Sequence, residues 1–79
     1  METQAIENTL HEVYSLVPHF LKLPETKMLV DYDKDADVLY ISFRRPQKAT
    51  DSKMLDNGVL LRYNHEELVG ITILEASKR

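Results

Sequence analysis

Four aspartates alternate with other residues over a short stretch of the chain, a pattern that suggests a loop able to bind a divalent cation. They are Asp31, Asp33, Asp35 and Asp37. An EF-hand loop that began at Asp31 would need glycine at its sixth position and a carboxylate at its twelfth. Those positions hold Ala36 and Ser42. The stretch therefore predicts a solvent-exposed turn in which Asp side chains accept hydrogen bonds from the neighbouring backbone.

A different set of carboxylates offers an alternative cation or small-ligand site at the end of the chain's predicted sheet. Its members are Asp35, Asp37, Asp56 and Glu75. Carboxylate oxygens suit hard divalent cations, but these four converge only in a strand register that residue types do not give. His19 and His65 have no companion at metal-ligand spacing. We expect no bound cofactor.

One trio of residues imitates a catalytic triad. Glu7, His11 and Ser15 follow one another at intervals of four, so a helix would place them on one face. A nucleophile also needs donors for an oxyanion and a pocket that excludes water. No glycine lies near these residues, and they lie opposite an apolar stripe. The trio predicts a solvated helix surface, and we expect the chain not to be an enzyme.

The basic residues gather in one loop. They are Arg44, Arg45, Lys48 and Lys53. Such a loop is either simply solvated or complementary to an acidic partner or a second copy of the chain. A nucleic-acid contact is a third interpretation, but the net charge of −3 disfavours it because neutralising phosphates requires a basic field.

The first of the elements that must position these residues is a helix. Apolar residues at spacings of three and four predict a helical arm over 1–24. Its stripe is formed by Ile6, Leu10, Val13, Val17 and Leu21. Pro18 lacks an N–H and clashes with the preceding turn. We therefore expect the helix to kink or end near 16–17, with a last turn over 19–23.

From residue 27 the apolar period changes from helical to alternating, which predicts β-strands. The runs are 28–33, 38–43, 53–56, 59–63 and 68–74. Asn57-Gly58 predicts a hairpin with a type I′ turn, and the short links favour antiparallel pairing. We predict an α+β fold in one domain, 1–79, in which an amphipathic helix packs against one face of an antiparallel β-meander of four to five strands over 27–75.

Apolar residues occupy both faces of the predicted sheet. Leu39, Ile41 and Phe43 share one face, whereas Val38 and Tyr40 lie on the other. One helix covers one face, so the second face predicts a partner chain, and we expect a homo-oligomer, dimer or higher. The expected interface residues are Tyr14, Val17, Phe20, Val38, Tyr40 and Leu60.

Length and composition bear on the need for a partner and on location. Seventy-nine residues lie near the lower limit for an independent core. The chain has no cysteine, so no disulfide supports it, and this favours the reducing cytoplasm. No apolar run approaches the roughly 18 residues of a membrane span, and we expect no membrane association.

Two sequence stretches carry a resemblance to a known family. The first is VDYDKDADVLYISF at 30–43, and the second combines LDNGVLLRY at 55–63 with LVGITILEAS at 68–77. They resemble the opening and closing hairpins of a small prokaryotic family, domain of unknown function 2283. The resemblance covers residues 27–78 and leaves the helical arm outside. It implies no assigned activity or catalytic residues, and for some members an antitoxin-like partnership with a small toxin-like protein.

These observations favour one functional hypothesis. The chain is expected to be a non-enzymatic protein-interaction module, antitoxin-like in role, that assembles through its helix and its sheet. A small toxin-like protein is one expected partner. The alternative is a small-ligand or metal-binding domain that uses the acidic end of the sheet.

Overall fold

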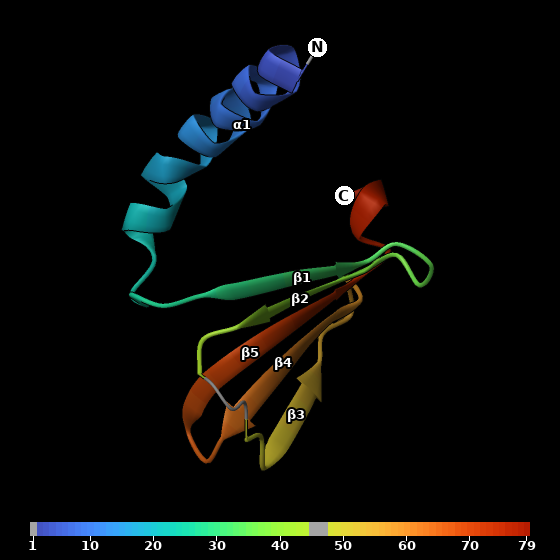
Figure 1. Ribbon diagram of the computed structural model, residues 1–79. Helices are drawn as coiled ribbons and strands as arrows, with labels where there is room; N and C mark the ends of the chain where they lie inside the picture. The colour runs from blue at the N-terminus through green and yellow to red at the C-terminus, as the bar shows by residue number, and fades with distance from the viewer. Residues whose placement is uncertain (1, 45–47) are drawn as a thin grey trace.

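Along residues 2–44 and 48–79, which the structure describes, the computed structural model has one α-helix, five β-strands and a short 3-10 turn (Figure 1). The elements are α1 (Glu2–Lys22), β1 (Leu29–Asp33), β2 (Val38–Ser42), β3 (Asp51–Met54), β4 (Val59–Asn64), β5 (Glu67–Leu74) and η1 (Ala76–Lys78). Every pair of neighbouring strands is antiparallel. The predicted α+β class, with a helix before an antiparallel sheet, is confirmed.

The strand order is β1-β2-β5-β4-β3, so the last strand lies in the middle of the sheet. The chain forms the hairpin β1–β2, then the meander β3–β4–β5, and β5 returns to pair with β2. Hydrophobicity explains this order, because β5 (ELVGITIL) is strongly apolar and takes the central position. The short polar strand β3 (DSKM) lies at an edge, where a charged side chain hinders pairing with other chains.

The hairpin predicted at Asn57-Gly58 is confirmed, but its expected turn type was wrong. The Gly58 N–H donates to the Leu55 carbonyl at 3.2 Å, which places Asp56 and Asn57 at the centre of the turn. Of these residues only Gly58 has a positive φ, of 81°. A type I′ turn needs positive φ at both central residues, so glycine instead serves as the left-handed residue that closes a longer connection.

The register divides the apolar residues of the sheet between two faces. Ile41, Ile71 and Leu61 lie opposite one another on β2, β5 and β4. We call the surface to which they belong the aliphatic face; its apolar members are Val30, Tyr32, Leu39, Ile41, Val59, Leu61, Ile71 and Ile73, and Lys53 of β3 lies on the same face, opposite Leu61. The opposite surface, the mixed face, comprises Asp31, Val38, Tyr40, Met54, Leu60, Arg62, Thr72 and Leu74.

Few side chains are fully enclosed. Among the described residues the buried apolar ones are Val38, Phe43 and Val69. Val69 lies where the register between β4 and β5 shifts, and its carbonyl accepts the N–H of Phe43 at 2.9 Å. Phe43 also lines a hollow with Leu23 of the segment that leads out of α1. Phe43 and Val69 therefore form a small core at the end of the sheet beneath the connection to the helix, whereas Val38 is buried separately at the opposite end, where β2 pairs with Leu74.

In the part of the chain that the structure describes, α1 packs on neither face of the sheet, so the expected packing of the helix was wrong (Figure 1). The helix projects away from the β1 edge and its apolar side chains are exposed, with Leu21 80% and Tyr14 63% accessible. The segment 23–28 leads from α1 to β1, and its Glu25 is bound by Arg44.

The helix also continues through Pro18 to Lys22, so it does not end near 16–17, one of the two outcomes expected there. Proline removes one N–H donor and introduces one steric conflict. Here both fall close to the natural end of the helix, where the Leu23 N–H closes the last turn on the Phe20 carbonyl at 3.2 Å. None of the described helical segments is both long and apolar enough to cross a membrane.

Candidate protein-interaction surface

The apolar side of α1 is wide as well as exposed. Successive residues of a helix are about 100° apart around its axis. On this basis the apolar arc covers roughly half of the helix circumference, in the order Leu16, Phe20, Val13, Val17 and Tyr14. Ile6, Leu10 and Leu21 lie within the same arc, and we call these eight residues the helix stripe. A helix packed on a single surface typically has an apolar stripe only slightly wider than about 100°. The helix stripe is thus wide enough for two neighbours.

One polar residue within this arc has its hydroxyl satisfied internally. Thr9 lies between Leu16 and Phe20 on the helix surface, and its Oγ1 donates to the Ala5 carbonyl at 2.9 Å. A hydroxyl that bonds to the preceding turn needs no water. Thr9 therefore does not prevent the helix stripe from being buried against a partner.

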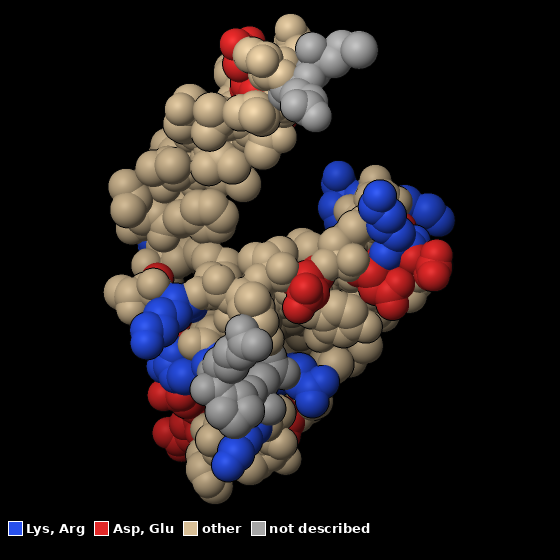
Figure 2. Space-filling model, in the orientation of Figure 1, with Lys and Arg blue, Asp and Glu red and all other residues tan. Residues whose placement is uncertain are grey.

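The aliphatic face lacks a covering layer over the described residues. On β1, Val30 and Tyr32 are 48% and 46% exposed. The side chains of β2, β4 and β5 on this face are half-buried, because only their neighbours within the sheet shield them. An antiparallel sheet usually buries one face against another layer. In Figure 2 the helix and the sheet enclose an open hollow whose walls are mostly uncharged.

Apolar residues also connect the helix stripe to the aliphatic face. Phe20 and Leu21 from α1, with Met28 and Val30 from the β1 side, line a hollow of about 490 Å³. A second hollow of about 300 Å³ lies next to it, between Leu23 and the residues Phe43, Leu68 and Ile71. The two surfaces are therefore parts of one apolar groove, with the segment 23–28 at its closed end.

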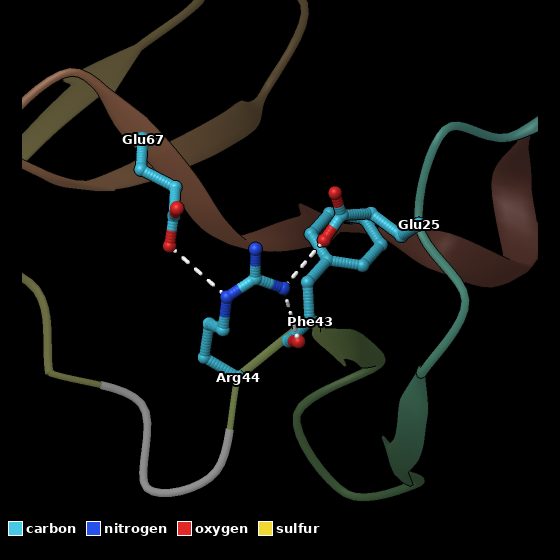
Figure 3. Close-up of polar contacts among 4 residues, drawn as sticks. All are labelled: Glu25, Phe43, Arg44 and Glu67. Atoms are coloured by element: carbon cyan, nitrogen blue, oxygen red, sulfur yellow. Dashed lines mark hydrogen bonds and ion pairs between the residues drawn. The ribbon is translucent and has the colours of Figure 1, made fainter.

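Arg44 fixes the closed end of this groove (Figure 3). Its Nη1 donates to Glu25 Oε1 at 2.6 Å and to the Phe43 carbonyl at 2.9 Å, and its Nε donates to Glu67 Oε1 at 3.0 Å. Hydrogen bonds to Glu25 and then Glu67 raise the pKa of the Arg44 guanidinium above its ordinary value. One side chain thus joins the segment after α1, the end of β2 and the start of β5.

Asp37 is the centre of a second polar cluster. Its Oδ1 accepts the Tyr32 hydroxyl at 2.6 Å and the Ser77 N–H at 2.9 Å, while its Oδ2 accepts the Ser77 hydroxyl at 2.7 Å. The Tyr32 hydrogen bond, followed by those of Ser77, lowers the pKa of Asp37. The same bond raises the pKa of Tyr32. This cluster attaches η1 to the β1–β2 hairpin.

The acidic turn has the geometry predicted from its aspartates. Asp33 Oδ1 accepts the N–H groups of Asp35 and Ala36 at 3.0 and 3.1 Å, so the turn is held by its own side chain. Asp37 has a φ of 56°, a left-handed conformation that aspartate tolerates better than most residues. The prediction of a self-bonded, exposed turn is confirmed.

The alternative cation site gains no support from this geometry. Asp35, Asp37, Asp56 and Glu75 all lie toward the same end of the sheet, but the carboxylate of Asp37 is already occupied by Tyr32 and Ser77. Over residues 2–44 and 48–79, no group of three or more His, Asp or Glu side chains is placed to hold a metal ion.

The helical trio and the basic loop have local partners. The Ser15 hydroxyl donates to the His11 carbonyl at 3.1 Å, as an ordinary helical serine does. Of the four residues expected in a basic loop, Arg44 is bound to Glu25 and Glu67 and Lys48 is exposed, whereas Lys53 lies, also exposed, in strand β3 and not in a loop. Arg45 lies outside the described residues.

The six residues expected at an interface fall into two groups. Tyr14, Val17 and Phe20 are exposed on the helix stripe, and Tyr40 is exposed on the mixed face. Leu60 is half-buried. Val38 is only 7% exposed, next to the end of the sheet where the Ala76 N–H donates to the Asp37 carbonyl, so its side chain is not open to a partner.

The sequence interpretation missed the aliphatic face as a free surface. It assumed that α1 covered one face of the sheet, and so assigned the interface to the other face, through Val38, Tyr40 and Leu60, and to three helix residues. The width of the helix stripe was a usable signal, because an arc of half the circumference exceeds what packing on one sheet face requires. Leu21, Met28 and Val30 were the other residues overlooked.

A comparison with protein-family models matches residues 29–77 to the family described as Protein of unknown function (DUF2283). The chain belongs to the DUF2283 family. The match begins at the first residue of β1 and ends within η1. It therefore includes the whole sheet and both members of the Asp37–Ser77 contact, and it leaves α1 and the segment 23–28 outside. Comparisons with curated proteins and with solved structures gave no match.

Proposed function

We propose that this DUF2283 chain is a protein-interaction module without a reaction of its own, and that its binding surface is the apolar groove between the helix stripe and the aliphatic face. The observation that carries the proposal is the simultaneous exposure of these two surfaces. Large contiguous apolar patches are rare on proteins that act alone, and they mark sites of association. Here a helix and a sheet present such patches to the same hollow.

Free-energy considerations support the same conclusion. Each Å² of apolar surface removed from water contributes roughly 25 cal/mol, so covering the helix stripe and the aliphatic face would stabilise the chain substantially. An isolated helix is marginal in water even when its residues favour helix, and α1 contains Pro18. Packing against a partner supplies the stabilisation that α1 lacks within its own chain.

The polar residues support a binding role over a catalytic one. Arg44, Asp37 and Ser15 each bond to groups that hold the fold together, as their contacts with Glu25, Ser77 and the His11 carbonyl indicate. We further propose a cytoplasmic location, which the cysteine-free composition supports because small extracellular domains commonly need disulfides. An antitoxin-like role has no separate support in this geometry, and a small toxin-like protein is one partner class that the following experiment would identify.

The test compares the tagged chain, isolated from its native cells, with a variant whose helix stripe is disrupted. Val17→Asp places a charge in the stripe, and Glu12→Gln on the polar side of α1 is the matched control. We expect the original chain and the control to be isolated in a complex larger than one chain, and the Val17→Asp variant to be isolated alone. A chain that stays monomeric and unaccompanied in all three cases would refute the proposal.

A further inference from the structure

We infer that the groove between α1 and the aliphatic face is occupied by α1 of a second copy of this chain, so that two protomers exchange helices across a two-fold axis. The inference rests on the proposed function and specifies its partner. It accounts for both exposed surfaces at once, because each protomer supplies one helix and one groove. In Figure 2 the hollow that would receive the partner's helix lies between the projecting helix and the sheet.

The amount of exposed surface agrees with this partner. The chain has a solvent-accessible surface of 6585 Å². A compact monomer of the same mass would expose about 4,900 Å², so the chain exposes roughly 1,600 Å² more than a closed fold does. Obligate homodimers bury about 1,000–2,500 Å² on each protomer. The excess is therefore of the size that one stable dimer interface would remove.

The overall shape supports the same conclusion. The radius of gyration is 14.7 Å, and the principal extents are 46 × 28 × 21 Å. A compact chain of this length has a radius of gyration of about 11.6 Å. The difference arises from α1, which projects from the sheet as an arm (Figure 1). An arm with an apolar side is the usual element that two subunits exchange.

The width of the helix stripe suits a position between two surfaces. In the exchanged arrangement each α1 contacts the partner's aliphatic face on one side and the partner's α1 on the other. A stripe that extends over about half of the circumference meets both requirements, whereas packing on one surface would use little more than about 100° of it. Thr9, with its hydroxyl bonded to Ala5, can be enclosed between these surfaces.

The contacts of Arg44 favour a second copy over closure of α1 onto its own sheet. Arg44 binds Glu25 at 2.6 Å and Glu67 at 3.0 Å, and these contacts hold the segment after α1 against the end of β2. In the conformation in which Arg44 binds Glu25, α1 points away from its own sheet (Figure 1). Receiving the helix of another chain leaves this cluster intact.

Charge along the helix and along the sheet favours the same geometry. In this exchange the two-fold axis lies perpendicular to the helices, which then run antiparallel, so Glu7 and Glu12 of one helix lie toward the half that contains His19 and Lys22 of the other. The mixed face is less suitable for a dry contact. It contains Asp31 and Arg62, and Arg62 Nε is buried without a hydrogen-bond partner among the described residues.

The test uses cysteines introduced into the full chain, which has none of its own. One variant is Val13→Cys at the middle of the helix stripe, and the other is Ile71→Cys at the middle of the aliphatic face. Cysteine behaves as a small apolar residue, so each variant should fold and assemble. The two purified variants are mixed, allowed to exchange subunits and treated with a short bifunctional thiol reagent. Because each chain has one thiol, every product links two chains.

We expect light scattering to give twice the mass of one chain, and the mixture to yield a Val13→Cys to Ile71→Cys product. The matched control, Ser15→Cys on the polar side of the helix, should yield at least tenfold less product with the same sheet variant. Leu10→Cys and Leu39→Cys form a second pair with the same expectation, in case either of the first variants misfolds.

Four outcomes would overturn the inference. The first is a monomer in which the thiol reagent links Val13→Cys to Ile71→Cys only when both substitutions are in the same chain. This would show that α1 closes over its own sheet. A dimer that links Ile71→Cys to itself but not to Val13→Cys would be a sheet-to-sheet dimer. A monomer that binds a different protein through the helix stripe would leave the proposed function standing while removing the second copy. A chain that stays monomeric and binds no other protein, including in its native cells, would refute both the inference and the proposed function.

Discussion

Among single residues, Asp37 and Arg44 join the parts of the molecule that are most distant in sequence. Asp37 receives hydrogen bonds from Tyr32 on β1 and from Ser77 in η1. Arg44 connects Glu25 with Glu67. Both clusters are solvent-exposed, so their value lies in fixing geometry: ion pairs at a surface contribute little net stability. The Asp37 cluster nevertheless makes folding depend on pH, because the pKa of its carboxyl is lowered in the folded chain.

Replacing Asp37 by asparagine tests this dependence. A carboxyl whose folded pKa is depressed stabilises the fold above its unfolded pKa, near the ordinary value of 3.8, and the stabilisation disappears as pH falls through the lower folded pKa. We therefore expect Asp37→Asn to melt at a lower temperature than the original chain at neutral pH, with the difference vanishing well below pH 3.8. Asparagine accepts the same positive φ, so the substitution removes the charge and one of the two acceptor oxygens without straining the backbone.

Thermal melts followed by circular dichroism between neutral and strongly acid pH measure this difference. Asp35→Asn is the control, because Asp35 lies in the same turn and participates there through its backbone N–H. Its melting temperature should follow that of the original chain at every pH. A Tm difference for Asp37→Asn that stays constant into strong acid would contradict the assignment.

At the scale of elements, α1 and the sheet differ in how they are stabilised. The sheet has hydrogen-bonded neighbours on every inner strand, with β5 between β2 and β4. The helix has its own backbone bonds and an exposed helix stripe, and it carries a proline in its last third. Helices in proteins owe most of their stability to packing of an apolar side. We therefore expect the helical content of α1 in solution to depend on assembly.

Replacing Pro18 by alanine is expected to strengthen α1 directly. Alanine restores an N–H donor and is up to about 3 kcal/mol more favourable than proline within a helix. Circular dichroism in a dilution series should show helicity of the original chain declining at low concentration, and helicity of Pro18→Ala declining less. Ser15→Ala serves as the control for a change on the polar side. Equal helicity of the two proteins at every dilution would contradict the coupling.

The sequence predicted an element correctly where a local pattern of residues determines that element. The acidic turn, the hairpin near Gly58 and the strands followed from residue type and alternation. The position of β5 beside β2 did not, because it depends on which strand is most apolar relative to all others. The direction of α1 also did not, since the segment after α1 is held by Arg44 bonding to Glu25, 19 positions earlier in the chain, a contact that no local pattern indicates.

At the scale of the whole molecule, the chain resembles part of a larger core. Its most apolar surfaces line a groove, and its charged residues gather at the ends of the sheet (Figure 2). This separation of apolar from charged residues explains which parts of the candidate surface could be predicted. A partner chain was predicted from apolar residues on both faces and stays a prediction, whereas the exposure of the aliphatic face became evident only from the position of α1.

Salt dependence distinguishes this apolar mode of assembly from one based on charge. Apolar association is strengthened by sulfate, whereas contacts with nucleic acid weaken steeply as salt increases. We expect the mass of the complex, measured by light scattering, to persist or increase when sodium sulfate is added. Sodium chloride at equal ionic strength is the control for screening of charges. Dissociation in both salts would show that the basic loop, and not the groove, holds the complex together.

The central place of β5 has a consequence for how the chain folds during synthesis. Chains emerge from the ribosome beginning with the N-terminus, and β5 is the last of the described strands to emerge. Until then, β1–β2 and β3–β4 exist only as separate hairpins, and two-stranded hairpins alone are marginal. The sheet therefore cannot be completed until β5 is available, whereas the residues of α1 are synthesised first and can meet another chain before that point.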